Sequence, residues 1–146
     1  MAASAWKVYN ETKKYLENGT IDLDTNVLKI ALYKSSSNVS TFTLSAQSEF
    51  TNVVNAAGYT GAKTLGNVVV TAGASASSIK FDASDVIFTA SGADVTSIMY
   101  AAIYVSGGKA LCWSKLSSSV FSVTSGNTLT VQFNSSGIWT LSGGTA

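Results

Sequence analysis

Short apolar segments with a two-residue period recur through most of this 146-residue chain. In residues 128–133, Leu129, Val131 and Phe133 alternate with polar side chains. Successive side chains of a β-strand point to opposite faces of a sheet, so this pattern predicts half-buried strands. Turns rich in glycine and serine separate the segments. We expect eight or nine strands, at residues 27–33, 67–71, 78–82, 86–90, 98–105, 110–116, 120–123, 128–133 and 138–141.

The spacing of these segments predicts the fold class. Many short strands joined by turns indicate an antiparallel sandwich or barrel, whereas a parallel α/β sheet would show helices alternating with the strands. Residues 98–105 are apolar on both faces and predict a central strand. Gly107 and Gly108 suit a tight hairpin that leads from it to residues 110–116. We therefore expect an all-β protein, an antiparallel β-sandwich with a jelly-roll-like strand order.

The beginning of the chain follows a helical period instead. In residues 5–17, Val8, Thr12 and Leu16 fall on one side of a helix, and Gly19 is suited to end it. Residues 46–54 fit either a short helix or an irregular loop. The expected organisation is an N-terminal helical segment (residues 1–19), a β-sandwich domain (residues 20–141) and a tail (residues 142–146).

Several residue types that carry out protein chemistry are missing from the chain. It has no histidine, no arginine and a single cysteine, Cys112, which we expect to be buried in its strand. A serine nucleophile usually needs a histidine base, and a zinc site needs more histidine or cysteine ligands. Serine and lysine three positions apart can form a catalytic pair, and three Ser-x-x-Lys pairs occur, at Ser4/Lys7, Ser77/Lys80 and Ser106/Lys109. A chain this rich in serine produces such pairs by chance. We therefore expect no enzymatic activity and no cofactor.

One acidic passage partly matches a calcium-binding loop. Asp22, Asp24 and Asn26 stand at the first three ligand positions of such a loop. Val27 replaces the glycine that the loop needs, and Tyr33 replaces its closing glutamate. We expect a solvated turn before a strand, and no metal site.

A second pair of carboxylates, Asp82 and Asp85, brackets the turn between two expected strands. Paired carboxylates are the catalytic groups of glycosidases. Aspartate at the end of a strand is also an ordinary turn former. We expect the structural role for both residues.

The charge of the chain is low and nearly balanced. Nine lysines and eight acidic residues give a net charge of +1, and charged residues make up only 12% of the chain. A nucleic-acid-binding protein would show clustered basic residues, with arginine prominent among them. The longest apolar run, residues 98–105, is too short to cross a membrane as a helix. We expect neither nucleic acid nor a membrane as a partner, whereas low charge favours association with another protein surface.

Aromatic residues supply the candidate interface. Trp113 and Trp139 stand at alternating strand positions, so we expect them in the core. Trp6, Tyr9 and Tyr15 lie in the N-terminal segment, outside the periodic part of the chain. They suit either an anchor on a neighbouring subunit or packing on the sandwich of their own chain.

The N-terminal passage carries a family resemblance. A short helix (KVYNETKKYLENG), the phrase TIDLDT and an apolar strand (VLKIALY) follow one another in residues 7–33. This order resembles the beginning of small structural proteins of tailed bacteriophages. The phrases FDASDV at residues 81–86 and GNTLTV at residues 126–131 are similar to the same group. The resemblance touches most of the chain and includes no catalytic motif.

What the resemblance implies is a virion component, a decoration or cement protein on the outside of the capsid. Its partner would be the major capsid protein, and the chain itself would act as a monomer or a homo-oligomer. It would be made in the host cytoplasm and located on the virion, with the segment around Trp6, Tyr9 and Tyr15 helping to dock it. Two alternatives stay open: a tail, neck or head-fibre component of the phage, and a carbohydrate-binding or adhesive β-sandwich module.

Overall fold

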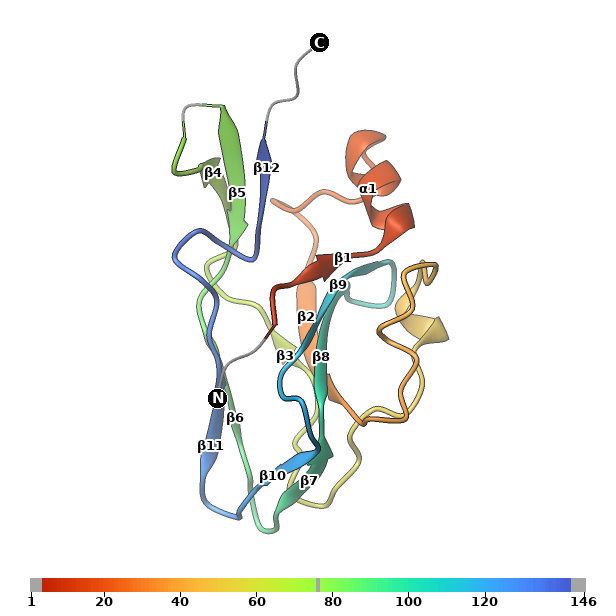
Figure 1. Ribbon diagram of the computed structural model, residues 1–146, viewed down its shortest axis with the longest axis vertical. Coiled ribbons are helices and arrows are strands. Elements are labelled where there is room, and N and C mark those ends of the chain that lie inside the picture. Colours follow the sequence, from red (N-terminus) through yellow and green to blue (C-terminus); the bar gives the residue numbers. More distant parts are fainter. Residues whose placement is uncertain (1–3, 76, 143–146) are drawn as a thin grey trace.

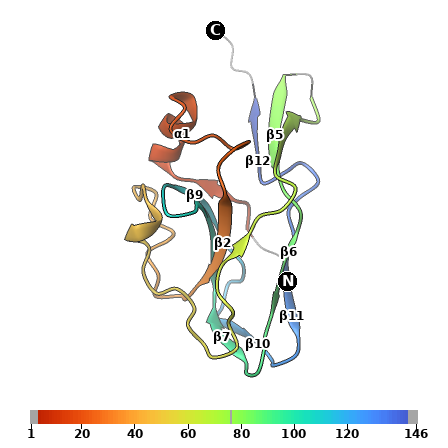
Figure 2. The same cartoon turned by 180° about the vertical axis from the view of Figure 1, so that it is seen from behind.

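Two layers of antiparallel strands face each other in the computed structural model, which describes residues 4–75 and 77–142 (Figures 1 and 2). The first layer is a five-stranded sheet in the order β1-β9-β8-β2-β3. The hairpin between β8 and β9 turns at Gly107, whose φ of 70° is readily adopted by glycine. The strands of this layer are β1 (Lys7–Val8), β2 (Leu28–Tyr33), β3 (Lys63–Thr64), β8 (Tyr100–Val105) and β9 (Ala110–Lys115).

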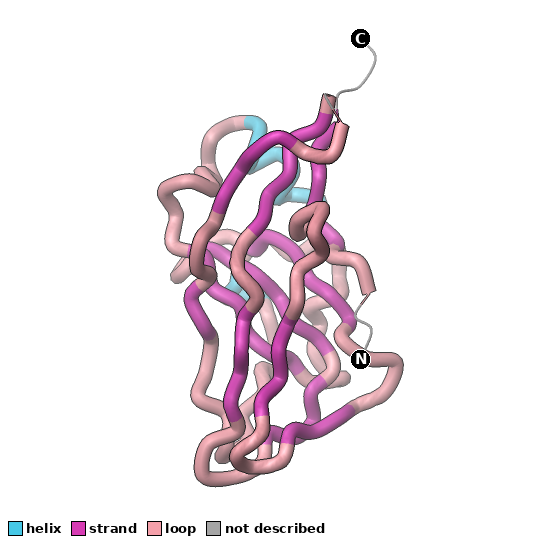
Figure 3. The backbone as a smooth tube through the Cα atoms, turned by 90° about the vertical axis from the view of Figure 1, so that its left-hand side faces the viewer, coloured by secondary structure: helices cyan, strands magenta, loops and turns pink. Residues whose placement is uncertain are grey.

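The second layer consists of shorter sheets placed end to end. A three-stranded sheet, β12-β5-β4, forms its upper part in Figure 1, and the pair β11-β6 forms its lower part. The chain runs directly from β5 into β6 through residues 83–85. Strands β11 and β12 lie beside this path and are joined by a connection that turns between Asn134 and Gly137 (Figure 3). These strands are β4 (Val69–Ala72), β5 (Ser78–Asp82), β6 (Val86–Thr89), β11 (Thr128–Val131) and β12 (Trp139–Ser142). The pair β7 (Val95–Ile98) and β10 (Phe121–Val123) lies at the bottom of Figure 1.

The main core lies between the layers. It is built from the inward side chains that the two-residue alternation predicts. Each large side chain buried there stabilises the fold by about 1.5–3 kcal/mol relative to exposure. Its largest members are Leu28, Ile30, Leu32, Ile98, Ile103 and Leu111, with Phe81, Phe88 and Val131 facing them.

A second cluster covers the other face of the first sheet. Tyr9, Tyr33 and Trp113 pack there against Val39 and Phe50 from the segment that follows β2. Strands β2 and β8 are therefore covered on both faces, which explains why their sequences are apolar on both faces. The same segment contains a 3-10 helix of three residues, Gln47–Glu49, within residues 46–54, which were expected to form a short helix or an irregular loop.

The all-β antiparallel sandwich is confirmed, and each expected strand corresponds to strands in the structure. The jelly-roll strand order stays a prediction. The expected helix of residues 5–17 is shorter: α1 spans Asn10–Glu17, because residues 7 and 8 instead pair with β9. The expected strand of residues 98–105 is interrupted at Met99: Ile98 ends β7, and β8 begins at Tyr100. Ser97, whose φ is 64°, lies within β7. Of the expected tail, Ser142 belongs to β12, and residues 143–146 lie outside the described residues.

Candidate interaction surfaces

The three aromatic residues of the N-terminal segment have different surroundings. Tyr9 is fully buried, and its hydroxyl donates a hydrogen bond to the Val39 carbonyl. Burial also raises the pKa of Tyr9 well above its usual value. The side chain of Tyr9 therefore packs inside its own chain and offers no surface to a partner.

Trp6 and Tyr15 remain partly accessible. The ring of Trp6 lies 5.6 Å from the ring of Phe133, centroid to centroid, beside the second layer. The ring of Tyr15 lies 4.7 Å below the ammonium group of Lys109, in the turn between β8 and β9. The two rings thus contact different partners, Phe133 and Lys109, and Tyr9 is buried, so the three residues do not form one continuous aromatic surface.

A groove runs along the side of the sandwich where Trp6 lies. Its volume is about 820 Å³, and it separates residues 4–6 from β11, β12 and the connection between these strands. Three half-buried aromatic rings line it, those of Trp6, Phe133 and Trp139. Exposed polar side chains stand beside them, including Gln132 and Asn134. We call this the edge groove.

A different surface lies on the upper three-stranded sheet. In its register Ala72, Ile79 and Leu141 stand side by side, and Val70 lies in the next row with the buried Phe81. This face continues the inner side of the second layer, but Ile79 is 47% exposed and Leu141 is 72% exposed. We call the four side chains Val70, Ala72, Ile79 and Leu141 the upper apolar face.

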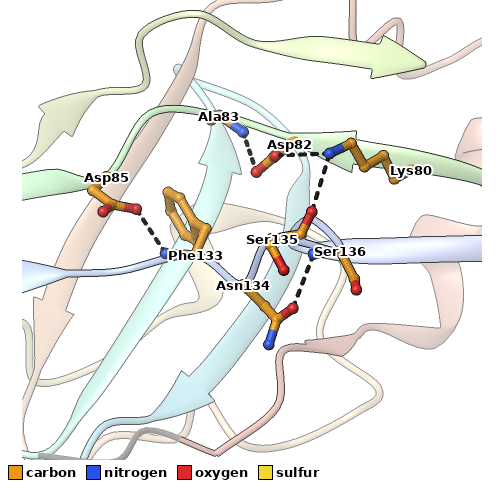
Figure 4. A network of polar contacts seen from close by, with 8 residues as sticks. All are labelled: Lys80, Asp82, Ala83, Asp85, Phe133, Asn134, Ser135 and Ser136. Atoms are coloured by element: carbon orange, nitrogen blue, oxygen red, sulfur yellow. Dashed lines mark hydrogen bonds and ion pairs between the residues drawn. The ribbon is translucent and has the colours of Figure 1, made fainter. Parts of the chain in front are cut away.

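The opposite face of the same sheet is polar. Lys80 forms an ion pair of 3.5 Å with Asp82 and donates a hydrogen bond of 3.1 Å to the carbonyl of Ser135 (Figure 4). One side of the upper sheet therefore carries the charged residues Lys80 and Asp82, which pair with each other, together with the exposed Val69. The other side is apolar and is left in contact with solvent. Such an exposed apolar patch is typical of an interaction surface.

The two carboxylates considered for a glycosidase have structural partners. Asp85 accepts a hydrogen bond of 2.9 Å from the backbone N–H of Phe133, which joins the β5–β6 bend to the β11–β12 connection (Figure 4). Asp82 accepts one from the backbone N–H of Ala83, in addition to its ion pair with Lys80. The expected turn between these strands is not found, because residues 83–85 continue from β5 into β6; both carboxylates instead accept structural hydrogen bonds.

The acidic passage before β2 closes a turn on itself. The side-chain oxygen of Asn26 accepts a hydrogen bond from the Asp22 N–H, and the carboxylate of Asp22 accepts one from the Asp24 N–H. Within residues 4–75 and 77–142, no group of three or more histidine, cysteine or acidic side chains is placed to hold a metal ion.

The lysines of the Ser-x-x-Lys pairs are engaged elsewhere. Lys80 contacts Asp82 and Ser135, and Lys109 lies over the Tyr15 ring. The ammonium group of Lys7 lies 5.0 Å from the centre of the Trp113 ring. Cys112 is fully buried, and burial raises the pKa of its thiol.

No known protein family, curated protein or solved structure matches this chain. Among the described helices, none is long and apolar enough to cross a membrane.

Sequence reasoning named Trp6 but missed both surfaces as such. Ile79 and Leu141 have the alternation of core residues, and only the arrangement of the layers leaves them exposed. The edge groove brings Trp6 together with residues more than a hundred positions later in the chain. No pattern within a short stretch of the sequence indicates that these residues lie close together.

Proposed function

We propose that this protein is a virion structural protein that binds the outer surface of a phage head and stabilises the shell. The observation that carries the proposal is the upper apolar face, which an isolated protein would leave in water. The resemblance of several sequence phrases to small structural proteins of tailed phages supports the same role. The partner is then the major capsid protein, and the protein is located on the virion.

The chemistry of the upper apolar face suits docking without catalysis. Burial of a leucine or isoleucine side chain contributes about 1.5–3 kcal/mol, and Leu141 and Ile79 keep much of that contribution available for binding. All four members are uncharged, so no ion has to be desolvated when a partner covers them. Three paired strands carry the face, which fixes the spacing of its side chains.

Four side chains alone make a small contact. A stable interface between two proteins usually buries about 800 Å² on each partner. The proposed docking therefore includes neighbouring surfaces or several copies acting together, because linked copies bind a repeating shell far more tightly than one copy does. Binding of these copies to the assembled shell then raises its resistance to heat, because binding favours the assembled state by mass action.

Binding to undecorated capsids tests the proposal. The capsids are assembled from the major capsid protein encoded in the same genome and mixed with purified protein, and bound protein is measured after sedimentation. We expect saturable binding and a higher temperature of capsid disruption. The variant Ile79→Thr/Leu141→Thr keeps strand-forming residues and net charge, and we expect it to bind at least about tenfold more weakly.

Ile87→Thr is the matched control. Ile87 is 55% exposed on β6 but points to the other side of the layer, so we expect binding to be unchanged. Wild-type protein that neither binds capsids nor raises their heat resistance would refute the proposal. Labelling of intact virions in the electron microscope separates the head from the tail, because a decoration protein repeats over the whole shell and a tail component does not.

A further inference from the structure

Strand β4 forms one outer edge of the upper three-stranded sheet (Figure 1). Among the residues that the structure describes, β5 is the only strand that pairs with it. Just beyond β4, the N–H of Gly73 donates a hydrogen bond of 2.8 Å to the carbonyl of Ser78, the residue opposite it in the same register. Opposite residues of an antiparallel pair alternate between hydrogen-bonded and non-hydrogen-bonded positions. Val70 and Ala72 therefore direct their backbone N–H and C=O groups away from β5.

This edge lacks the usual protection against pairing with another chain. Natural proteins keep edge strands short or place lysine, proline or another charge on them. The two edges of the first sheet follow this rule, because β1 and β3 have two residues each and contain Lys7 and Lys63. The other outer strand of the upper sheet, β12, borders the edge groove, which residues 4–6 line as well. Strand β4 has four exposed residues, no charged residue or proline occurs between Lys63 and Lys80, and the strand is open to a further strand.

The sequence of this edge is complementary to itself. Residues 69–73 read Val-Val-Thr-Ala-Gly. Two antiparallel copies centred on Thr71 place this residue opposite itself, as a favourable pair of threonines. Val70 then stands opposite Ala72 of the second copy, and Val69 likewise opposite Gly73. Each valine thus meets a small residue, and no charged side chain meets its own copy across the axis.

The backbone groups of β4 fit the same register. Val70 of one copy and Ala72 of the other stand opposite each other, and both direct their backbone groups outward. Such a pair exchanges two N–H···O=C hydrogen bonds, and the symmetric contact contains this pair twice. Thr71 lies between the two pairs at the non-hydrogen-bonded position, where opposite Cα atoms are about 4.5 Å apart. A second copy therefore provides a partner for every outward backbone group of β4.

We propose that two copies of this protein pair through β4, antiparallel and centred on Thr71, so that their upper sheets join into one continuous sheet. The two-fold axis runs perpendicular to this sheet, so both copies present their upper apolar faces on the same side. Contacts between dimers then still involve this face. The joined segment is shorter than the about 20–30 residues that each partner contributes to a standard interface, so the dimer is weak in solution.

A cysteine at the centre of the contact tests the register. In Thr71→Cys the two introduced thiols face each other, at a Cα separation within the range of about 4.4–6.8 Å that a disulfide requires. Val69→Cys and Thr140→Cys are matched controls, because both residues are exposed on the same side of the upper sheet as Thr71. The Val69 positions of two paired copies lie about 13 Å apart along the strands, which is too far for a disulfide. Thr140 lies on the opposite edge, in β12.

The three cysteine variants are equilibrated at equal concentration in a buffer of reduced and oxidised glutathione, which exchanges with the introduced thiols. Disulfide-linked dimer is measured by electrophoresis without reductant. The native Cys112 is fully buried, and the wild type serves as the blank. We expect at least about tenfold more linked dimer in Thr71→Cys than in either control.

A charge at the same position tests the pairing without an added thiol. Thr71→Glu places two carboxylates opposite each other in the dimer, whereas within one chain the carboxylate faces Lys80. Thr140→Glu faces the same Lys80 from β12 and is the matched control. In sedimentation equilibrium at millimolar concentration we expect the wild type to form dimers, Thr71→Glu to dimerise at least about tenfold more weakly, and Thr140→Glu to match the wild type. Urea unfolding shows that each variant keeps its fold.

Three results would overturn the inference: the wild type stays monomeric at millimolar concentration, Thr71→Cys forms no more linked dimer than its controls, or Thr71→Glu dimerises as the wild type does. A dimer that Thr140→Glu abolishes instead would assign the contact to β12 and would likewise refute it. Ile79→Thr/Leu141→Thr changes only the upper apolar face and is expected to keep the β4 dimer. Failure of the β4 pairing and failure of the decoration proposal are therefore distinguishable.

Discussion

The hydroxyl of Thr12 connects α1 to the first sheet from inside the protein. The side chain is fully buried, and its Oγ1 donates a hydrogen bond of 2.7 Å to the carbonyl of Ala110 in β9. Thr12→Val keeps the shape of the side chain and removes the donor, which leaves a buried carbonyl with one partner fewer. We expect the free energy of unfolding, measured in urea, to fall by about 1–3 kcal/mol.

Thr128→Val is the control for this prediction. Thr128 is exposed at the start of β11, so we expect the same substitution there to change the free energy of unfolding by less than about 0.5 kcal/mol. Equal losses in the two variants would contradict a specific role for the Thr12 hydroxyl.

Single residues also show where sequence reasoning stops. Trp113 was expected in the core because its strand alternates, and it is buried. Tyr9 was placed with Trp6 and Tyr15 because the three share one short segment. Its burial depends on Val39, from a loop thirty residues later in the chain. The pattern within a short segment indicates its secondary structure, but it does not indicate which distant residues will cover that segment in the fold.

At the scale of elements, the short helix Gln47–Glu49 depends on one carboxylate. Glu49 accepts hydrogen bonds from the N–H and hydroxyl of Ser45 and from the N–H of Ala46. The bonds from Ser45 are the main reason that the pKa of Glu49 lies below its usual value of 4.5. The stabilisation is therefore complete above pH 4.5 and is lost as the pH falls through the lowered pKa of the folded state.

An NMR titration checks this element. We expect the amide signals of Ser45 and Ala46 to move together with a midpoint below pH 4.5, and to lose their pH dependence in Glu49→Gln. Glu17→Gln, at the exposed end of α1, removes the same charge and is expected to leave both signals unchanged. A midpoint above pH 4.5 would show that these hydrogen bonds do not favour the ionised carboxylate.

The elements that sequence predicts well here are those whose local pattern and tertiary contacts agree. Strands β6 and β11 are examples, because their alternation matches their two faces in the sandwich. The N-terminal helix was predicted too long. Val8 fits a helical period equally well, but pairing with Cys112 extends the first sheet, and this tertiary pairing overrides a local preference. Jelly-roll order is a property of strand connections, on which alternation carries no information.

At the scale of the molecule, the fold class followed from sequence but the two surfaces did not. Whether Leu141 is covered depends on how far the first layer reaches opposite the second, and that extent is set by all the strand lengths together. The edge groove likewise exists only because residues 4–6 lie beside β11, β12 and the connection between these strands. The absence of histidine and arginine reduced the number of catalytic and binding sites to consider. The positions of the upper apolar face and the edge groove became clear only from the arrangement of the two layers.

The whole molecule has little charge to keep copies apart. Its net charge is +1 and its isoelectric point is about 7.8, so electrostatic repulsion between copies is weakest near that pH. The upper apolar face then dominates the encounters between copies. We expect the second virial coefficient, measured by static light scattering, to be most negative near pH 7.8 and to rise in Ile79→Thr/Leu141→Thr, whose net charge is unchanged. In the control Ile87→Thr/Val120→Thr, two exposed apolar residues are removed elsewhere, and we expect a clearly smaller rise. Equal rises would mean that general surface hydrophobicity, and not this face, governs self-association.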